Sequence, residues 1–350
     1  MPASVPHIEV MPLRSIAALL SVLILSPATP RSNVPSGRIA FVLRTDVNRI
    51  YSIRPDGTGL RRLGSLPRGL QRGGDVKPAW SPDGRWIAFA RDVPRSGNDR
   101  LWLYRMRGDG TGLRRLTGDS ETLDSTPSWS PDGTRIVFTR ATSPAASLAW
   151  IYRIRSDGSE EERLSDGYVF DFSPAWSSSG GTIAYAHQGV GRSRSRVELQ
   201  GQLILMHEGA PRDEALNLFV SDLAWSPDGS RLAFVGVRRQ LGRTCSRHLN
   251  TGRLLLGLNP ARRSAPAGCV RHGDIYVVGA DGNTGLVRLT KSSADDRHPS
   301  WSPDGKQIVF SSGRPARLYV VSAAGGTPRL LFSPRRGQAL DPAWSPSTSP

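Results

Sequence analysis

The chain has 350 residues, with 46 Lys and Arg against 30 Asp and Glu and a formal net charge of +16. Its 37 Gly and 27 Pro exclude a helical bundle or a coiled coil, because both residues break helix interiors, and a hydrophobic content of 38% excludes wholesale disorder. The charge invites a nucleic-acid-binding interpretation, but only three basic residues are Lys (Lys77, Lys291 and Lys306). An Arg-heavy composition is also what a GC-rich genome encodes.

Residues 1–28 predict a secretory signal peptide, with Met11 as an alternative start. An arginine precedes an apolar run from Ile16 to Leu25, and residues 26–28 supply the small side chains that a signal peptidase reads. Ten helical residues span about 15 Å, half of a bilayer core, so no transmembrane span is expected. The alternative is an apolar strand or tail. We therefore expect an exported protein, periplasmic or secreted.

A repeated motif fills the chain from residue 37 to residue 350, after a linker over 29–36. The copies are PAWSPDGRWIAFARD at Pro78, PSWSPDGTRIVFTR at Pro127, PAWSSSGGTIAYAH at Pro174, LAWSPDGSRLAFVG at Leu223, PSWSPDGKQIVFSS at Pro299 and PAWSPSTSP at Pro342. In each copy Ala-Trp-Ser predicts a short strand, Ser-Pro-Asp-Gly a tight turn, and Ile-Ala-Phe a returning strand. Segments such as RLYVVSAAGG and PRLLF predict a third and a fourth strand. Four antiparallel strands per repeat are typical of a β-propeller blade.

The two ends of the chain supply complementary parts of one blade. The last copy stops after its first strand, while GRIAFVL, RIYSIRPDG and GLRRLG near the N-terminus predict a second, third and fourth strand. Pairing the C-terminal first strand with three N-terminal strands would close the ring and remove its exposed sheet edges. The sequence thus predicts an all-β fold, a six-bladed β-propeller with four-stranded antiparallel blades.

The repeat resembles that of the TolB-like six-bladed propellers, and it is similar to the propeller domains of prolyl oligopeptidase-like peptidases. The resemblance covers about residues 37–350 and implies a propeller in an exported setting more than it implies a particular function. TolB-like proteins carry an α/β domain before the propeller, whereas only about ten residues separate the expected cleavage site from the first strand here. The peptidases carry an α/β-hydrolase domain, for which no residues remain.

No catalytic arrangement stands out in the sequence. It contains no Gly-x-Ser-x-Gly elbow, no phosphate-binding loop and no His-Glu-x-x-His, so we expect a protein that is not an enzyme. The repeated Trp residues are interpreted as packing residues. The Asp residues of the blade turns are likewise interpreted as structural: Asp83, Asp132, Asp228, Asp304, Asp56, Asp109, Asp157 and Asp281.

Polar residues recur just before the repeat Trp, in the strand that lines the channel of a propeller. Every copy carries an Asp either five or three positions before its Trp, and ring closure would gather these positions around one channel mouth. The functional interpretation is an acid-rich funnel for a peptide or a cation, and the structural one is hydrogen bonding of each Asp to its neighbouring blade. The predicted site comprises Asp75, Lys77, Asp124, Thr126, Asp171, Ser173, Asp222, Asp296, His298 and Asp341.

An insertion of about 30 residues, over roughly 238–272, interrupts the fifth copy between its second and third strands. It contains no acid and eight arginines: Arg238, Arg239, Arg243, Arg247, Arg253, Arg262, Arg263 and Arg271. Cys245 and Cys269 lie inside it and are predicted to form a disulfide in an exported protein, with two free thiols as the alternative. The loop is interpreted either as a docking element for an anionic envelope polymer, lipid headgroups or an acidic protein, or as a solvated variable insertion.

The leading hypothesis is an exported, non-enzymatic propeller, expected to be a monomer, that binds a protein or peptide partner of the cell envelope at its channel mouth. The alternative is a hydrolase or a lactonase-like metal enzyme built at that mouth, where the Asp set could hold a divalent cation. No cofactor is otherwise expected. Nucleic-acid binding is disfavoured because no reading motif is present and export removes the partner.

Overall fold

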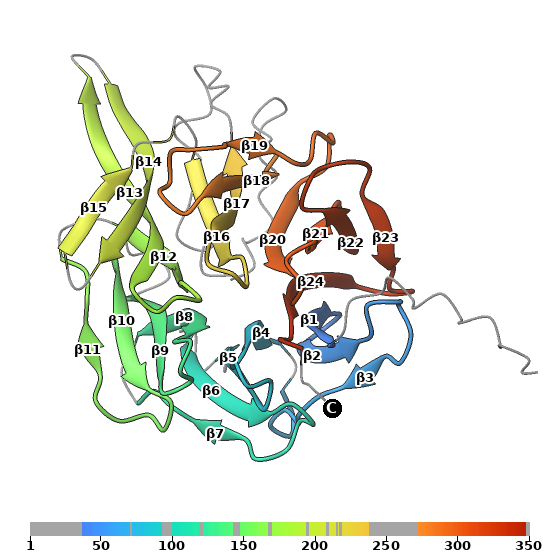
Figure 1. Ribbon diagram of the computed structural model, residues 1–350. Coiled ribbons are helices and arrows are strands. Elements are labelled where there is room, and N and C mark those ends of the chain that lie inside the picture. The colour runs from blue at the N-terminus through green and yellow to red at the C-terminus, as the bar shows by residue number, and fades with distance from the viewer. Residues whose placement is uncertain are drawn as a thin grey trace, which may run out of the picture. The chain divides into compact units, whose positions relative to one another are not determined.

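The computed structural model describes residues 37–70, 72–92, 100–118, 122–142, 148–166, 170–193, 196–207, 210–214, 216, 219–237 and 272–347. All regular structure in these ranges is β (Figure 1). No helix among them is long and apolar enough to cross a membrane. The strands of the first half are β1 (Ile39–Arg44), β2 (Asn48–Ile53), β3 (Arg61–Arg62), β4 (Gly74–Trp80), β5 (Trp86–Asp92), β6 (Leu101–Arg107), β7 (Arg114–Arg115), β8 (Leu123–Trp129), β9 (Arg135–Ala141), β10 (Ala149–Arg155), β11 (Glu162–Arg163) and β12 (Phe170–Trp176).

The second half continues the same order of strands. Its strands are β13 (Thr182–Ser193), β14 (Arg196–His207), β15 (Ala210–Glu214), β16 (Phe219–Trp225), β17 (Arg231–Val237), β18 (Asp274–Gly279), β19 (Val287–Arg288), β20 (Asp296–Trp301), β21 (Gln307–Ser312), β22 (Arg317–Ser322), β23 (Arg329–Phe332) and β24 (Gln338–Trp344). Strand β17 ends at Val237 and β18 begins at Asp274, and these are the second and third strands of their group.

Consecutive strands pair antiparallel in groups of four, which we call blades: β4–β7, β8–β11, β12–β15, β16–β19 and β20–β23. Single parallel residue pairs, such as Asn48↔Gly74 and Leu101↔Leu123, link some neighbouring blades. These links merge several blades into one 16-stranded sheet beside two four-stranded sheets. The number of sheets therefore does not by itself give the number of blades.

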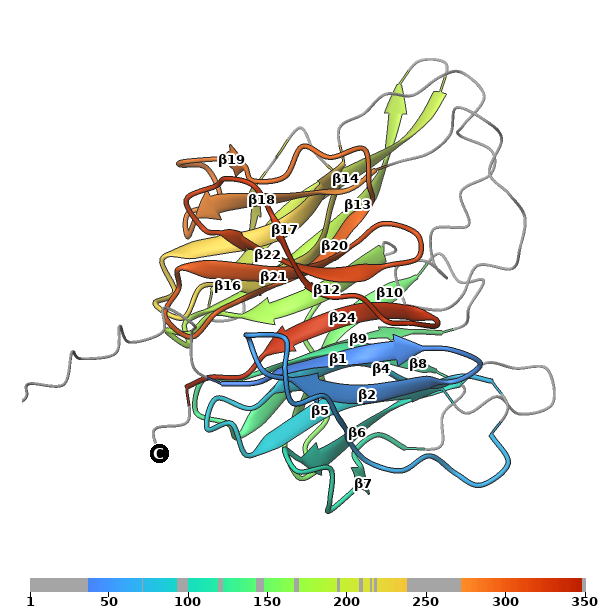
Figure 2. The ribbon, with the colours of Figure 1, turned by 90° about the vertical axis from the view of Figure 1, so that its right-hand side faces the viewer.

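The two ends of the described chain meet in one blade. Strand β24 pairs antiparallel with β1, from Ile39↔Trp344 to Arg44↔Gln338, and β1 continues into β2 and β3. Figures 1 and 2 both show β24 beside β1, between β20–β23 and β4–β7. The predicted pairing of the C-terminal first strand with three N-terminal strands is present.

The core lies within the blades and between them. The Phe of each Ile-Ala-Phe segment is fully buried and faces a Tyr on the third strand, as in the pairs Phe89–Tyr104 and Phe138–Tyr152 with ring centroids 5.9 and 5.8 Å apart. Such cross-strand aromatic pairs contribute packing beyond their buried area. Residues of neighbouring blades share apolar clusters, and one joins Val309 of β21 to Phe41 of β1.

The Asp residues of the blade turns are held as turn residues. In the Ser-Pro-Asp-Gly turn at 226–229, the Ser226 hydroxyl donates to Asp228 Oδ1 at 2.5 Å and the Ser230 backbone N–H donates to the same atom at 3.0 Å. These bonds lower the pKa of Asp228 to about 2. Equivalent bonds hold Asp83, Asp132 and Asp304, which supports their structural interpretation.

Replacing Asp228 by Ala should lower the free energy of unfolding by about 1 kcal/mol at pH 7, because two hydrogen bonds to an ionised acceptor are lost. The folded pKa lies below the ordinary value of 3.8, so the stabilisation is present above pH 4 and is lost as the pH falls toward 2. Urea unfolding of both proteins at several pH values measures this difference. A difference that stayed constant from pH 7 to pH 2 would contradict the assignment.

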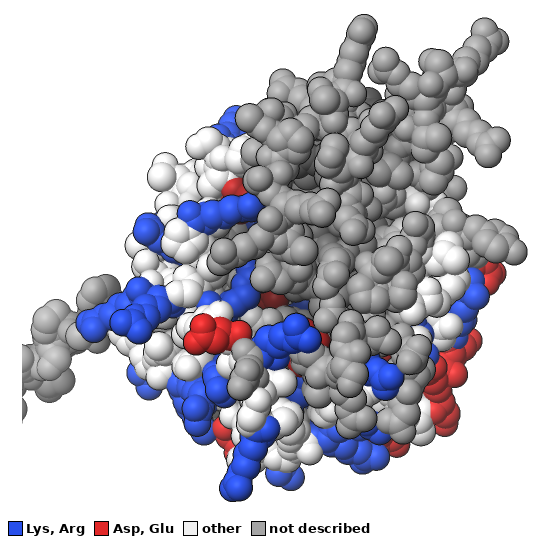
Figure 3. All heavy atoms as spheres, turned by 180° about the vertical axis from the view of Figure 1, so that it is seen from behind, with Lys and Arg blue, Asp and Glu red and all other residues white. Residues whose placement is uncertain are grey.

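Charged residues are spread unevenly over the described surface. In Figure 3, which shows the face opposite that of Figure 1, Lys and Arg follow the left and lower edges, while Asp and Glu gather at the right edge. Blades with similar backbones therefore differ in surface charge.

Candidate binding site in the central channel

The residue three positions before the repeat Trp lies in a β-bulge of the first strand of each blade. In β4 the register shifts between Val76 and Ala79, so that Lys77 and Pro78 together oppose a single residue of β5. Proline lacks the N–H that a ladder needs and is typical of bulges. The bulge residues have positive φ values of 49–55°, which is unusual for residues other than Gly. They are Lys77, Thr126, Ser173, Asp222, His298 and Asp341.

Four of these side chains form a charged network that crosses the channel. Lys77 Nζ of β4 lies 3.1 Å from Asp222 Oδ1 of β16 and 3.3 Å from Asp341 Oδ1 of β24. His298 Nε2 of β20 lies 3.0 Å from the same Asp341 atom and 3.5 Å from Asp222 Oδ1. Residues from four blades therefore meet at one place, which no single repeat could encode.

Electrostatics of the network favour ionised Lys and Asp with a neutral His. Burial lowers the pKa of Lys77, but Asp222 and Asp341 outweigh it and the net shift is upward. Burial raises the pKa of Asp222 and of Asp341, but His298 and Lys77 outweigh it and both are lowered. For His298 burial outweighs the two carboxylates and the pKa is lowered from 6.5. With a neutral His298, the network carries one excess negative charge at pH 7.

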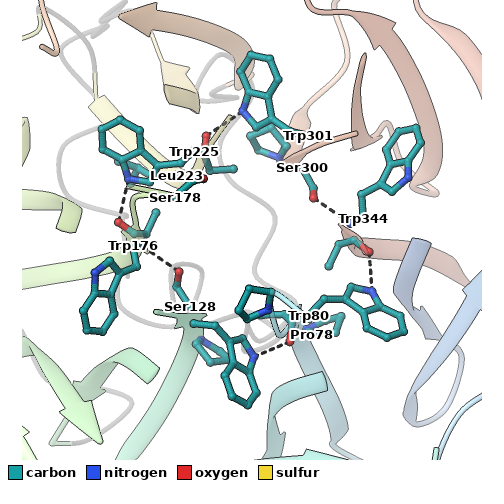
Figure 4. Close-up of a pocket in the computed structure, with 18 of the residues that line it drawn as sticks. Pro78, Trp80, Ser128, Trp176, Ser178, Leu223, Trp225, Ser300, Trp301 and Trp344 are labelled. Atoms are coloured by element: carbon teal, nitrogen blue, oxygen red, sulfur yellow. Dashed lines mark hydrogen bonds between the residues drawn. The ribbon is translucent and has the colours of Figure 1, made fainter. Parts of the chain in front are cut away.

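The network forms one side of a pocket of about 560 Å³ on the face that carries the Ser-Pro-Asp-Gly turns. The wall repeats the motif from all six copies: the Pro or Leu223 after each bulge residue, the next Ala or Ser, the Trp, and the residues of the following turn. Figure 4 shows the labelled Trp residues arranged around the pocket. The recess is thus lined by proline, tryptophan and small residues, and its charged groups lie on the channel side.

Hydrogen bonds between neighbouring first strands hold this wall together. The indole N–H of one blade donates to a backbone carbonyl of the blade before it, in Trp129 to Ala79 (3.0 Å), Trp225 to Ala175 (3.0 Å), Trp301 to Ala224 (3.0 Å) and Trp80 to Ala343 (3.2 Å). At the two other boundaries a backbone N–H donates to a serine hydroxyl, in Trp176 to Ser128 (3.0 Å) and Trp344 to Ser300 (2.9 Å). The Trp residues are therefore inter-blade packing residues, as the sequence predicts.

The carboxylates five positions before the Trp belong to a different environment. Asp75 accepts two hydrogen bonds from Arg91, at 2.6 and 3.1 Å, and Asp124 accepts two from Arg140, at 2.7 and 2.9 Å. Asp171 lies 2.7 Å from His187 Nδ1, and Asp296 accepts from the Ser292 hydroxyl at 3.3 Å. None of these four carboxylates lines the pocket.

The structure therefore divides the predicted site into two sets. Lys77, Thr126, Ser173, Asp222, His298 and Asp341 all line the pocket, and the four other carboxylates are buried within blades. The expectation that each Asp bonds its neighbouring blade is wrong for Asp75, because its partner Arg91 lies on the second strand of the same blade. Asp124 is held by Arg140 of its own blade and also by a side-chain hydrogen bond with Thr117 of the preceding blade. The expectation holds for Asp341, which accepts from the backbone N–H of Lys77 in the next blade at 3.3 Å.

Sequence reasoning missed the arginine partners and the proline wall. Arg91 and Arg140 follow their Asp partners by 16 residues, a spacing that the hairpin fixes through its register. The Pro that directly precedes the predicted first strand in five of the six copies was a readable sign of a bulge, since Pro is excluded from regular ladders. Nothing in a single repeat indicates that Lys77 reaches across the ring.

Other sequence predictions fall outside the described residues. Arg238 to Arg271 of the basic insertion, with Cys245 and Cys269, lie there, so the loop and its predicted disulfide remain predictions. Within the described ranges, no group of three or more His, Cys, Asp or Glu side chains is arranged to hold a metal ion.

The blades, the bulged inner strands and the ring of tryptophans define a β-propeller. A family model described as the TolB beta propeller domain matches residues 26–205, and the chain belongs to this family. Over 118 residues it is 30% identical to the Tol-Pal system protein TolB of Bordetella pertussis strain Tohama I. That match covers 29% of this chain and 27% of the relative, so just over a quarter of the relative's length is matched.

Solved structures agree on the fold. The crystal structure of TolB from Acinetobacter baumannii superimposes with a TM-score of 0.64 at 20% sequence identity, covering 90% of this chain and 69% of that one. A putative TolB from Agrobacterium tumefaciens gives a TM-score of 0.56 at 19% identity, covering 89% and 93% of the two chains. At this level of identity the likeness establishes the propeller fold alone.

Proposed function

We propose that the protein is an exported, non-enzymatic propeller scaffold that binds a protein or peptide partner of the cell envelope in its channel pocket. The signal-like segment at 1–28 supports export, and membership of the TolB propeller family supports a Tol-Pal-type envelope setting. The alternative of a lactonase-like metal enzyme is favoured by no observation in the described residues.

A six-bladed closed ring is part of this proposal. Six bulge residues with positive φ, one in each copy of the repeat, support the count. The pairing of β24 with β1 and the indole bond from Trp80 to the Ala343 carbonyl support closure. A closed ring matters for function because it fixes the pocket wall from every side and leaves little to reorganise on binding.

One observation carries the proposal: a recess of about 560 Å³ whose wall is proline and tryptophan and which holds a charged network on one side. Binding sites combine apolar walls with a few placed polar groups, and Trp is enriched at the centres of interfaces. The excess negative charge of the network favours a partner segment that presents an amino or guanidinium group.

A pocket-filling substitution tests the proposal. Leu223 stands in the wall where the other copies have Pro, outside the charged network, so Leu223→Arg places a long cation in the recess. We expect at least a tenfold loss of the partner recovered from envelope extract by the tagged protein, measured by quantitative mass spectrometry. His298→Phe, at the charged side of the pocket, should give a similar loss.

Val287→Arg is the matched control, because Val287 is 49% exposed on the outer strand β19 and the same charge is added there. It should leave the partner yield unchanged, and all variants should retain the melting temperature of the parent within a few degrees. Equal yields for the pocket variants and the parent protein would exclude the pocket as the binding site. Equal losses for Leu223→Arg and Val287→Arg would also exclude it.

A further inference from the structure

Three consecutive blades carry almost all their outer-edge charge as arginine. Residues 48–63, which include β2 and β3, hold four Arg and one acid, and residues 100–117, with β6 and β7, hold five Arg and one acid. Residues 313–337, with β22 and β23, hold five Arg and no acid. The next edge is different, because residues 148–166, with β10 and β11, hold three Arg and five acids.

The three arginine-rich edges form one continuous surface. A Cβ added to Gly57, in the turn between β2 and β3, would lie 2.9 Å from the Leu331 carbonyl of β23. One added to Gly110, in the turn between β6 and β7, would lie 2.5 Å from the Gly64 nitrogen. Arg61 also donates to the Asp109 carbonyl at 2.9 Å. The outer strand of each blade therefore touches the turn of the next.

Exposed leucines stand among these arginines. The described residues contain five exposed large hydrophobic side chains, and three of them are Leu60 (48% exposed), Leu113 (39%) and Leu330 (45%). Leu60 and Leu113 directly precede the Arg pairs of β3 and β7, and Leu330 follows Arg329 in β23. All three lie near the start of a fourth strand, so they share the same end of their blades.

Stacking on tryptophan holds part of this surface in place. The Arg115 guanidinium lies 5.1 Å from the ring centroid of Trp102, and Arg105 and Arg107 lie 4.4 and 5.5 Å from that of Trp86. These contacts reduce the freedom of the side chains while leaving Arg107 and Arg115 exposed. A surface that is partly ordered before binding loses less entropy when it binds.

We propose that this surface docks on an anionic lipid membrane, with the arginines on headgroup phosphates and the leucines in the boundary between headgroups and acyl chains. We call it the arginine arc. It comprises Arg54, Arg61, Arg62, Arg107, Arg114, Arg115, Arg329, Leu60, Leu113 and Leu330. Figure 3 shows this side of the molecule as the left and lower edges, where Lys and Arg are seen, opposite the acidic edge.

The leucines favour a membrane over a soluble polyanion. A soluble polyanion would be bound by the arginines alone, and three leucines exposed beside them would remain in water. At a membrane surface each basic residue contributes attraction that salt screens, whereas apolar insertion adds a part that salt does not remove. The arc lies outside the channel pocket, so a partner held there and a membrane could be bound together.

The full exported chain should be tested with vesicles of phosphatidylglycerol and of phosphatidylcholine in a sedimentation assay. We expect binding to the anionic vesicles only. Arg61→Ala/Arg62→Ala/Arg114→Ala/Arg115→Ala should weaken it roughly 30-fold or more, a conservative figure for four basic residues at a membrane surface. Leu60→Ser/Leu113→Ser should weaken it about fivefold and make the remainder vanish at high salt.

Arg153→Ala/Arg155→Ala/Arg163→Ala is the matched control, because these residues lie on the acidic edge of β10 and β11. It should change binding less than twofold, and circular dichroism should show every variant folded. Undiminished vesicle binding by the four-arginine variant would overturn the proposal and point to another basic segment. If the leucine variant binds as well as the parent and polyphosphate competes fully, the occupant is a soluble polyanion and the membrane assignment is wrong.

Discussion

Replacing Lys77 by Met is expected to destabilise the protein by about 3–5 kcal/mol at pH 7, because it leaves two buried carboxylates without their shared cation. Asp222 and Asp341 come from β16 and β24, and their side chains are only 11% and 9% exposed. Urea unfolding measures the loss. Removing one partner of a buried ion pair costs far more than the pair itself contributes, since the remaining charges lose both water and their counter-ion.

The same variant should reverse the pH dependence of stability. In the parent protein the pKa of His298 lies below 6.5, so the unfolded state binds a proton first and stability falls as the pH drops below 6.5. Without Lys77, the two carboxylates are expected to raise the pKa of His298 above 6.5, with burial and the nearby Arg297 still opposing the rise. A raised folded pKa stabilises at low pH, and this contribution is lost as the pH rises through the folded value. Lys77→Met should therefore be more stable at pH 5.5 than at pH 8.

A second variant distinguishes the effect of losing the charged network from the effect of losing packing. Lys77→Met/His298→Asn removes the titrating group, so the variant should be unstable at both pH values, with no gain at pH 5.5. Imidazole NMR titration of His298 in Lys77→Met provides a direct measurement. If Lys77→Met were destabilised by less than 1 kcal/mol, or if its stability still fell below pH 6.5, the network would not act as described.

Local sequence predicted the local structure well. The Ser-Pro-Asp-Gly turns, the buried Phe of the second strand and a first strand that contains the repeat Trp are all present, because each depends on neighbouring residues only. The pairing of β24 with β1 was also predictable, since a blade that lacks strands at one end of the chain needs the strands at the other end.

Two features of the site depend on distant residues, and the sequence did not reveal them. The two sets of polar residues looked equivalent, but a shift of two positions across a bulge places Asp75 against Arg91 and Lys77 in the channel. The partner of Lys77 is Asp222, 145 residues away, and only the ring arrangement brings them together.

The sequence drew the expected basic surface to one insertion, whereas the structure also gathers arginines from three separate segments into one surface. The insertion at 238–272 is recognisable in the sequence because its eight arginines lie within one short segment. The arginines of the arc are split between residues 48–63, 100–117 and 313–337, and only the contact between consecutive outer strands unites them. A cluster of arginines contributed by several repeats can be recognised only when the structure shows which repeats are neighbours.

Deleting residues 338–350 is expected to abolish cooperative folding. The deletion removes β24, and with it the buried Trp344 and Ala339, the ladder to β1 and the acceptor of the Trp80 indole bond. Losing a buried Trp alone costs about 3–5 kcal/mol, and whole domains are stable by only about 5–15 kcal/mol. Removing an entire strand should therefore cost as much as the whole free energy of unfolding of the protein. Circular dichroism and thermal unfolding of the truncated chain measure this outcome.

Matched truncations test whether the loss of folding comes from removing strand β24 or only from removing the chain end. Deleting only residues 348–350, beyond β24, should leave the melting temperature unchanged, and Trp344→Ala should fall between the two deletions. Supplying residues 338–347 as a separate peptide should restore part of the signal, because an unpaired β1 edge is a template for the missing strand. A deletion of 338–350 that unfolded cooperatively near the parent's melting temperature would contradict closure by β24. Strand β24 also contributes to the pocket, since Asp341 lies on this strand and joins the network around Lys77.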